Sequence, residues 1–281
     1  MSLCQTRFYD KQENMKPQLD HITIYPIKSC SGINLQQAHV EVRGFPLDRR
    51  WMLIETDGHF ISQRTTPQMG QIRIQIVDNR LIAKYLDHES LTFDVATHNP
   101  EQVESHIWKD SLPSYLVSKE VSNWFSDILG RTVHLVFMDQ DITRPLLKEQ
   151  LPNDQVFEVS FADGYPYLLT NQASLDDLNE RLEQPISMDR FRSNLVVNGF
   201  EAFAEDHWKR IRIGDVDFMV VKPCARCQIT RIDQKTGIAS KEPLKTLATY
   251  RKQGGQVMFG MNLVALNQGI IEVNQPVRIL E

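Results

Sequence analysis

The sequence predicts a mainly β fold with a few helices, an α+β protein built from two modules. Three observations lead to this expectation. Short runs of β-branched and aromatic residues alternate with polar turns through the first half, and helical spacing of apolar residues is confined to a few stretches. A polar segment with prolines and mixed charge, 139–154 (DQDITRPLLKEQLPND), separates the two parts. Many short strands joined by polar turns are typical of a barrel or a folded-over sheet.

Length and composition exclude several classes of protein. The chain has 281 residues, of which 41% are hydrophobic and 24% charged, enough apolar material for a core. The net charge of −5 gives no reason to expect a nucleic-acid partner. No apolar run approaches the ~18 residues of a membrane span, and the polar N-terminus carries no secretory signal. We therefore expect a cytoplasmic protein with neither a nucleic-acid nor a membrane partner.

The first module, expected over 17–138, consists mainly of strands. The run 21–25 (HITIY) is β-branched and aromatic and ends at a proline. A second run, 51–55 (WMLIE), precedes an Asp-Gly dipeptide at 57–58, which is typical of hairpin turns. The run 71–77 (QIRIQIV) alternates polar and apolar residues, the pattern of a half-buried strand. Further strands of the same meander are expected at 81–85, 90–95 and 132–138.

One helix is expected in this first module. Apolar residues recur at helical spacing in 117–130 (VSKEVSNWFSDILG), so that they share one face. Gly130 stands where a left-handed residue commonly ends a helix. The residues of the apolar face are Val121, Trp124, Phe125, Ile128 and Leu129.

The second module, expected over 142–281, mixes helices and strands. One helix is expected over 173–182, with Ser174 and Asp177 spaced like a capping box, and another over 242–251. Short runs rich in β-branched and aromatic residues around them predict strands. These runs are 167–170, 195–197, 211–213, 216–222, 257–266 and 277–280.

The most unusual local feature is the cysteine pair in Lys222-Pro-Cys-Ala-Arg-Cys227, for which three explanations are open. A zinc site needs four ligands, and the sequence shows no second cysteine pair or close histidine pair. A thioredoxin-like dithiol begins a helix, whereas this pair lies between two strand-like runs; two buried cysteines need no chemistry at all. The guanidinium of Arg226 beside Cys227 favours the thiolate, which acts as a nucleophile or binds a soft metal.

Basic residues stand at the ends of several expected strands, beside serine or asparagine. Lys28-Ser29, Arg49 and the pair Arg192 and Asn194 could together form an anion-binding cradle, although each basic residue alone also fits a solvated surface charge. The loop 160–167 (SFADGYPY) contains Gly164, which permits unusual dihedrals and a close backbone approach to a ligand. An ordinary turn explains the same loop.

With these motifs the chain resembles MOSC-domain proteins that carry the MOSC N-terminal β-barrel module. Within that family it is similar to bacterial molybdenum-cofactor reductases of N-hydroxylated bases and to the mitochondrial amidoxime-reducing component. The matching pieces are 24–32 (IYPIKSCSG), 47–53 (LDRRWML), 160–179 (SFADGYPYLLTNQASLDDLN), 191–197 (FRSNLVV), 205–216 (EDHWKRIRIGDV) and 222–237 (KPCARCQITRIDQKTG). The resemblance implies an N-terminal β-barrel-like module packed on a MOSC β-barrel domain.

The resemblance also implies a cofactor and its site. In the family the second cysteine of the motif, here Cys227, is the protein ligand to the molybdenum of the molybdenum cofactor (Mo-molybdopterin). The loop at 163–165 is Asp-Gly-Tyr here and Asp-Thr-Ser in the mitochondrial relatives, so a hydroxyl contact made there is replaced or lost. The residues that match cofactor-binding positions are Lys28, Ser29, Arg49, Asp163, Gly164, Tyr165, Arg192, Asn194, Ala225, Arg226 and Cys227.

The implied activity is the reduction of small N-hydroxylated compounds, such as N-hydroxylaminopurines and hydroxylamines, to amines, in a detoxification role. Close bacterial relatives carry a cysteine-rich ferredoxin-like tail that is absent here up to Glu281. Either the sequence ends before it, or a separate flavoprotein or iron–sulfur protein donates the electrons. Two alternatives stay open: a sulfur-transfer or molybdenum-cofactor carrier module, and a β-rich interaction domain with an incidental cysteine pair.

Overall fold

The computed structural model describes residues 16–281 apart from 97, 148–150 and 153–154. Strands dominate it, which confirms the predicted mainly β fold with a few helices. The α-helices of this described part are α2 (Lys119–Leu129), α3 (Gln172–Arg181) and α4 (Leu244–Leu247). Its 3-10 helices are η1 (Pro67–Gln71), η2 (Met188–Phe191), η3 (Ala204–His207) and η4 (Gln228–Arg231). Within these ranges no helix has the length and apolar character needed to cross a bilayer.

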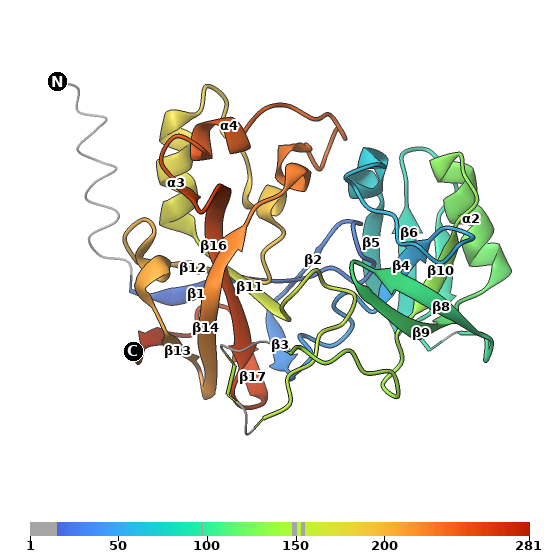
Figure 1. Cartoon of the computed structure of the whole chain (residues 1–281), viewed down its shortest axis with the longest axis horizontal. Helices are drawn as coiled ribbons and strands as arrows, with labels where there is room; N and C mark the ends of the chain where they lie inside the picture. Colours follow the sequence, from blue (N-terminus) through green and yellow to red (C-terminus); the bar gives the residue numbers. More distant parts are fainter. Residues whose placement is uncertain (1–15, 97, 148–150, 153–154) are drawn as a thin grey trace.

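A nine-stranded sheet forms one half of the molecule, where α3 and α4 also lie (Figure 1). Its strands, in spatial order, are β18 (Val277–Ile279), β13 (Arg210–Ile213), β14 (Val216–Ala225), β16 (Gln256–Ala265), β11 (Tyr167–Asn171), β12 (Leu195–Asn198), β1 (Gln18–Ile24) and β2 (Ile33–Leu35), with β15 (Lys252–Gln253) paired to β16. A two-stranded sheet joins β3 (Gln37–Val40) to β17 (Gly269–Glu272). The core of this half includes Tyr167, Phe218 and Leu263, all fully buried.

Two smaller sheets and α2 form the other half (Figure 1). One sheet has the order β4 (Trp51–Ile54), β10 (His134–Phe137), β9 (Asp110–Leu116) and β8 (Gln102–Ile107), and the other runs β5 (Arg73–Val77), β6 (Arg80–Lys84) and β7 (Leu91–Asp94). A second hydrophobic core holds this half together around Trp51, Phe125 and Leu135, each fully buried.

The helix α2 forms where its sequence pattern predicts it. The Ser118 hydroxyl caps its start by accepting a hydrogen bond from the Val121 amide at 3.2 Å, and Gly130 ends it with a left-handed φ of 64°. Val121, Phe125 and Leu129 are buried against the strands. The apolar face read from the sequence is therefore the packed face.

The helices of the second half differ from their predictions in two ways. The cap of α3 is Asn171, whose side chain accepts from the Ala173 amide at 3.2 Å, so the predicted Ser174 capping box is wrong. The Ser174 hydroxyl instead donates to the buried Glu205 carboxylate at 2.8 Å. The helix predicted over 242–251 is only the single turn α4, because the chain beyond it enters the β15–β16 hairpin through Gly254 and Gly255.

The first two strands of the chain, β1 and β2, belong to the large sheet. β1 pairs with β12 and with β2, and β3 pairs with β17, so segments from both ends of the sequence share these sheets. The sequence did not predict six strands, because these runs are very short or are interrupted by charged residues, proline or glycine; they are β2, β3, β8, β9, β15 and β17. The module limits 17–138 and 142–281 stay a prediction. The loop after β1 connects the two halves, because its Lys28 and Ser31 amides donate to the carbonyls of Trp51 and Ile72.

Candidate functional site

A cavity of ≈ 180 Å³ lies where segments from the two halves approach each other. The loop after β1, the turn before β4, the loop before β11 and the end of β14 all contribute to its wall. Backbone hydrogen bonds hold these segments together: the Lys28 amide donates to the Trp51 carbonyl at 2.8 Å, and the Phe161 amide donates to the Arg49 carbonyl at 3.0 Å. The residues predicted for the cofactor all line it: Lys28, Ser29, Arg49, Asp163, Gly164, Tyr165, Arg192, Asn194, Ala225, Arg226 and Cys227.

Cys227 follows the end of β14 and precedes η4, and its side chain is half-buried in the cavity wall. The Cys227 carbonyl accepts from the Thr230 amide at 3.2 Å and from the Thr230 hydroxyl at 2.9 Å, which fixes the turn. The segment after the cysteine pair is the short 3-10 helix η4 and not the α-helix that follows a thioredoxin-like dithiol. In the described ranges, no three histidine, cysteine or acidic side chains group as metal ligands.

The guanidinium that contacts the Cys227 sulfur belongs to Arg64, which the sequence did not single out. Its Nη2 lies 3.5 Å from Cys227 Sγ and 3.1 Å from Asp163 Oδ2. Arg226, expected to act on Cys227, instead places Nη1 3.1 Å from Cys224 Sγ. The reason is that residues two apart in extended chain point the same way, and Arg226 continues the extended course of β14.

Arg64 lies in the turn between β4 and η1. The Thr65 and Thr66 amides both donate to the Ser62 carbonyl, at 3.1 and 3.0 Å, and the Arg64 amide donates to the Ser62 hydroxyl at 3.3 Å. This short polar stretch looks like an ordinary exposed turn in the sequence, so only the fold shows that its arginine reaches the cavity.

Lys28 and Asp163 form an ion pair in the cavity wall, in which the Lys28 side chain is buried and the Asp163 side chain is 50% exposed. The Lys28 ammonium donates to the Asp163 carboxylate and to the Phe161 carbonyl, the latter at 2.8 Å. Burial lowers the pKa of Lys28, and the Asp163 charge opposes that shift. Burial would raise the pKa of Asp163, but Lys28 and Arg64 together hold it well below its ordinary value. Asp163 is therefore a carboxylate at any pH near neutrality.

Three of the cavity residues have a left-handed backbone that is uncommon for residues other than glycine. The φ angles are 70° for Ser29, 50° for Arg49 and 55° for Arg192. Such a conformation costs about 1–2 kcal/mol per residue and tends to occur at functional sites. Gly164, from which unusual dihedrals were expected, does not have a positive φ. A Cβ added to Gly164 would meet no atom within 4 Å, so this glycine leaves space in the cavity.

Tyr25 and Asn194 hold the two cradle arginines in place. The guanidinium carbons of Arg49 and Arg192 each lie 4.3 Å from the centre of the Tyr25 ring. Arg49 Nη1 donates to Asp48 Oδ2 at 2.5 Å and to Asn194 Oδ1 at 3.0 Å. The side-chain amide nitrogen of Asn194 also donates to the Thr23 carbonyl at 3.1 Å. This second hydrogen bond fixes the Asn194 side chain, whose oxygen in turn orients Arg49.

Several groups in the cavity wall fit an anionic ligand with a metal. The Tyr165 hydroxyl and Arg226 Nε are buried without a hydrogen-bond partner among the described residues. Arg192 donates to the Cys30 carbonyl at 2.7 Å but forms no ion pair within the same ranges. Burial lowers the pKa of Arg192. Unpaired donors around a half-buried thiol suit the phosphate and sulfur ligands of Mo-molybdopterin.

Thiol alkylation should separate the cysteines of the fold by burial. Cys30 is fully buried, and burial raises its pKa to about 12, so that its thiol is protonated near neutral pH. Cys224 and Cys227 are partly exposed. In molybdenum-free protein, iodoacetamide should therefore label both of them well before Cys30, which reacts only after unfolding. Peptide mapping measures the labelling of each of these three cysteines separately from that of Cys4, which lies outside the described residues. Labelling of Cys30 as fast as that of Cys224 and Cys227 would contradict the expectation.

Comparison with known proteins agrees with this architecture. Residues 16–132 match the MOSC N-terminal beta barrel domain, and residues 157–278 match the MOSC domain. Mitochondrial amidoxime reducing component 2 of Rattus norvegicus is 32% identical over 274 residues, 91% of this chain and 81% of that protein. Mitochondrial amidoxime-reducing component 1 of Danio rerio is 32% identical over 91% of this chain and 82% of its own.

A third relative is the molybdenum cofactor sulfurase of Oryza sativa subsp. japonica, 32% identical over 87% of this chain but only 32% of its own length. The two domain matches follow each other along the sequence, and the amidoxime-reducing components align over most of both chains. The chain therefore belongs to the family of proteins that combine a MOSC N-terminal β-barrel domain with a MOSC domain, to which the mitochondrial amidoxime-reducing components are related.

Proposed function

We propose that this chain is a molybdenum-cofactor-dependent reductase that converts small N-hydroxylated compounds to amines. The observation that supports it most is that the half-buried Cys227 lines the same cavity as several cationic groups from distant segments of the chain. The amidoxime-reducing relatives, similar over most of their length, favour the same class of reaction. A cytoplasmic location, a detoxifying role and a separate electron-donor protein are part of this proposal.

The residues of the cavity have distinct roles in this proposal. The cofactor, when bound, supplies the two-electron chemistry of N–O reduction. Cys227 would be the protein ligand to its metal, and Lys28, Arg49 and Arg192 would hold its phosphate. Arg64 Nη2, 3.5 Å from Cys227 Sγ, would donate to this sulfur when it ligates the metal. Asp163 ties Lys28 and Arg64 to one another, so that both cations stay aimed at the cavity.

The overall reaction consumes two electrons, which two molecules of a one-electron donor such as reduced benzyl viologen supply. The N–O bond of R–NHOH breaks, two electrons and two protons are taken up, and the products are R–NH₂ and water. The test is to express the chain in cells that make the cofactor, measure molybdenum per protein, and assay anaerobic reduction of 6-hydroxylaminopurine with reduced benzyl viologen. Stoichiometric molybdenum with formation of adenine supports the proposal; molybdenum at background in soluble protein ends it.

A sulfur-transfer or carrier role is the second candidate, supported by the sulfurase relative. In that role Cys227 would carry an additional sulfur atom as a persulfide. Intact-mass and peptide mass spectrometry of the isolated protein would show a mass increase of one sulfur at that cysteine. An unmodified thiol in protein that turns over N-hydroxylated substrate would exclude this candidate.

Trp108 is expected to contribute to binding of planar substrates at the cavity rim. It lies in the turn between β8 and β9 with a φ of 57° and a 51% exposed side chain. Its Nε1 donates to Asp163 Oδ1 at 3.3 Å, and the Arg64 guanidinium carbon lies 4.5 Å from its ring centre. Both partners line the cavity, so this exposed indole stands next to the groups around Cys227.

Trp108→Ala should therefore raise the KM for 6-hydroxylaminopurine about fivefold, which corresponds to about 1 kcal/mol of aromatic stacking. The KM for hydroxylamine, which has no ring, should change much less. Leu86→Ala is the matched control, because Leu86 is also exposed, at 69%, and has a positive φ of 44° in a distant turn. Equal changes in KM for both substrates would mean that Trp108 acts only on the shape of the loop.

A further inference from the structure

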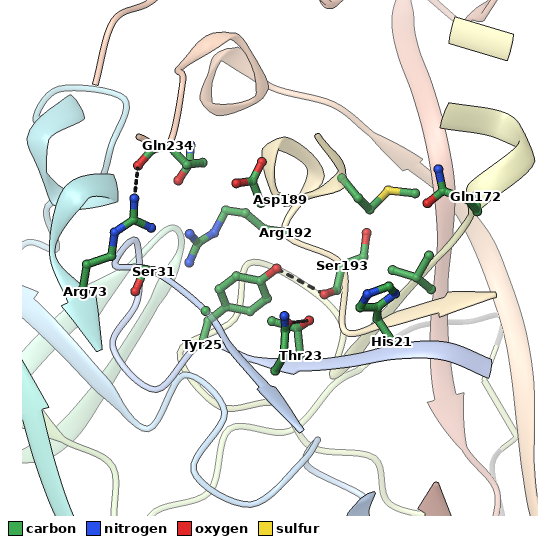
Figure 2. A pocket seen from close by; sticks show the side chains of 14 residues that line it. His21, Thr23, Tyr25, Ser31, Arg73, Gln172, Asp189, Arg192, Ser193 and Gln234 are labelled. Carbon is green, nitrogen blue, oxygen red and sulfur yellow. Dashed lines mark hydrogen bonds between the residues drawn. The ribbon is translucent and has the colours of Figure 1, made fainter. Parts of the chain in front are cut away.

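A second and larger cavity, of ≈ 310 Å³, shares Arg192 and no other lining residue with the Cys227 cavity. Figure 2 shows it between the loop after β1, the start of β5 and the segment around η2. Most of its lining residues are polar, and apart from Arg192 neither the resemblance nor the proposed reaction uses them. The charged groups of its wall indicate which kind of ligand the cavity accepts.

Two guanidinium groups in this cavity lack a carboxylate partner. Neither Arg73 nor Arg192 forms an ion pair in the part of the chain that the structure describes. Arg73 Nη2 makes only a long contact of 3.5 Å with the Gln234 carbonyl, and Arg192 Nη1 donates to the Cys30 carbonyl at 2.7 Å. In Figure 2 the Arg192 side chain extends towards Arg73, and Ser31 lies beside both. Each guanidinium therefore keeps donors to spare.

Ser31 adds a third donor to this corner of the cavity. Its side chain is buried, and its hydroxyl oxygen accepts a hydrogen bond from the Ile74 amide at 2.9 Å. The hydroxyl proton is then available to donate to a ligand. Tyr25, whose hydroxyl donates to the Ser193 carbonyl at 3.2 Å, forms the floor below Arg192.

The acidic residue of the wall, Asp189, forms no ion pair with these cations in the described part of the chain. Its Oδ1 accepts from the Ser187 hydroxyl at 2.5 Å. A bound oxyanion would supply the ion-pair partner that both guanidinium groups lack. Two guanidinium forks suit a carboxylate or a phosphate, whose oxygens can each accept from a separate N–H.

We propose that this second cavity is a binding site for a small oxyanion, a carboxylate or a phosphate, held by Arg73, Arg192 and Ser31. The site does not depend on the proposed reductase function. Because Arg192 lines both cavities, an anion in the second cavity shares a charged group with the ligand of the first.

Isothermal titration calorimetry at low ionic strength tests the site, with inorganic phosphate and acetate as separate titrants. Arg73→Gln is the informative variant, since Arg73 is exposed, lines only the second cavity and leaves the core untouched. The matched control is Arg64→Gln, which removes a guanidinium that lines only the Cys227 cavity. Molybdenum content is measured in each preparation, so that loss of cofactor is seen separately.

The expected result is a binding isotherm for at least one anion that weakens tenfold or more in Arg73→Gln and persists in Arg64→Gln. The titrant that binds more tightly tells whether the site prefers a carboxylate or a phosphate. Affinity unchanged in Arg73→Gln, affinity lost in Arg64→Gln alone, or no binding of either anion to the unaltered protein would each overturn the proposal. Thermal unfolding of both variants confirms that they are folded at the titration temperature.

Discussion

Cys227→Ser is expected to remove molybdenum and reductase activity together while leaving the fold intact. The side chain of Cys227 faces the cavity and belongs to none of the buried hydrophobic clusters. The turn that presents it is held through its carbonyl, which serine retains. A hydroxyl is a far poorer ligand for a soft metal than a thiolate. We expect activity to fall by at least the ~10–100-fold that changes outside the ligand set already cause.

The matched control is Cys224→Ser. Cys224 lines the same cavity three residues earlier, and its sulfur contacts Arg226 instead of Arg64. Molybdenum measured by plasma mass spectrometry and the thermal unfolding midpoint are compared for both variants. Cys224→Ser should keep molybdenum near the level of the unaltered protein. Molybdenum retained by Cys227→Ser, or lost equally in both variants, would contradict the assignment of the ligand.

Strong local patterns explain why much of the fold could be predicted from the sequence. The helix α2 has a capping serine, a complete apolar face and a terminal glycine, and all three features act within one short segment. At the start of α3 both Asn171 and Ser174 have side chains that can cap a helix. Asn171 is the cap, because the Ser174 hydroxyl donates to the buried Glu205. That choice depends on a residue about thirty positions away, so local spacing could not reveal it.

In the candidate site, too, contacts between residues far apart in the sequence could not be predicted from local patterns. The resemblance assigned residues one by one, and the fold brings all of them to one cavity. The sequence could not indicate Arg64, because its contact with Cys227 joins residues 163 positions apart. It also could not predict the second cavity, because Arg73 begins β5 and Arg192 follows η2, more than a hundred residues later. Only the packing of the two halves decides which cations face which sulfur.

Asp48 is expected to be the most important carboxylate for the stability of this arrangement. Its side chain is only 1% exposed; it accepts from the Tyr25 amide at 2.7 Å and from Arg49 Nη1 at 2.5 Å. Asp48→Ala leaves a largely buried guanidinium without its counter-charge and the Tyr25 amide without its acceptor. Removing one partner of a buried ion pair costs about 3–5 kcal/mol. Urea unfolding should show a decrease of that size in the free energy of unfolding.

Two further variants separate the lost pair from the loss of a carboxylate in general. Asp177→Ala breaks a more exposed pair with Arg181, for which about 0.3–0.5 kcal/mol is expected. The double variant Asp48→Ala/Arg49→Met removes both charges of the pair. Because Arg49 is then not left without its counter-charge, the double variant should recover part of the stability without recovering molybdenum. If Asp48→Ala costs no more than Asp177→Ala, the pair does not stabilise the site. If the double variant is the least stable of the three, the cost of Asp48→Ala comes from lost packing and hydrogen bonds rather than from the unpaired charge of Arg49.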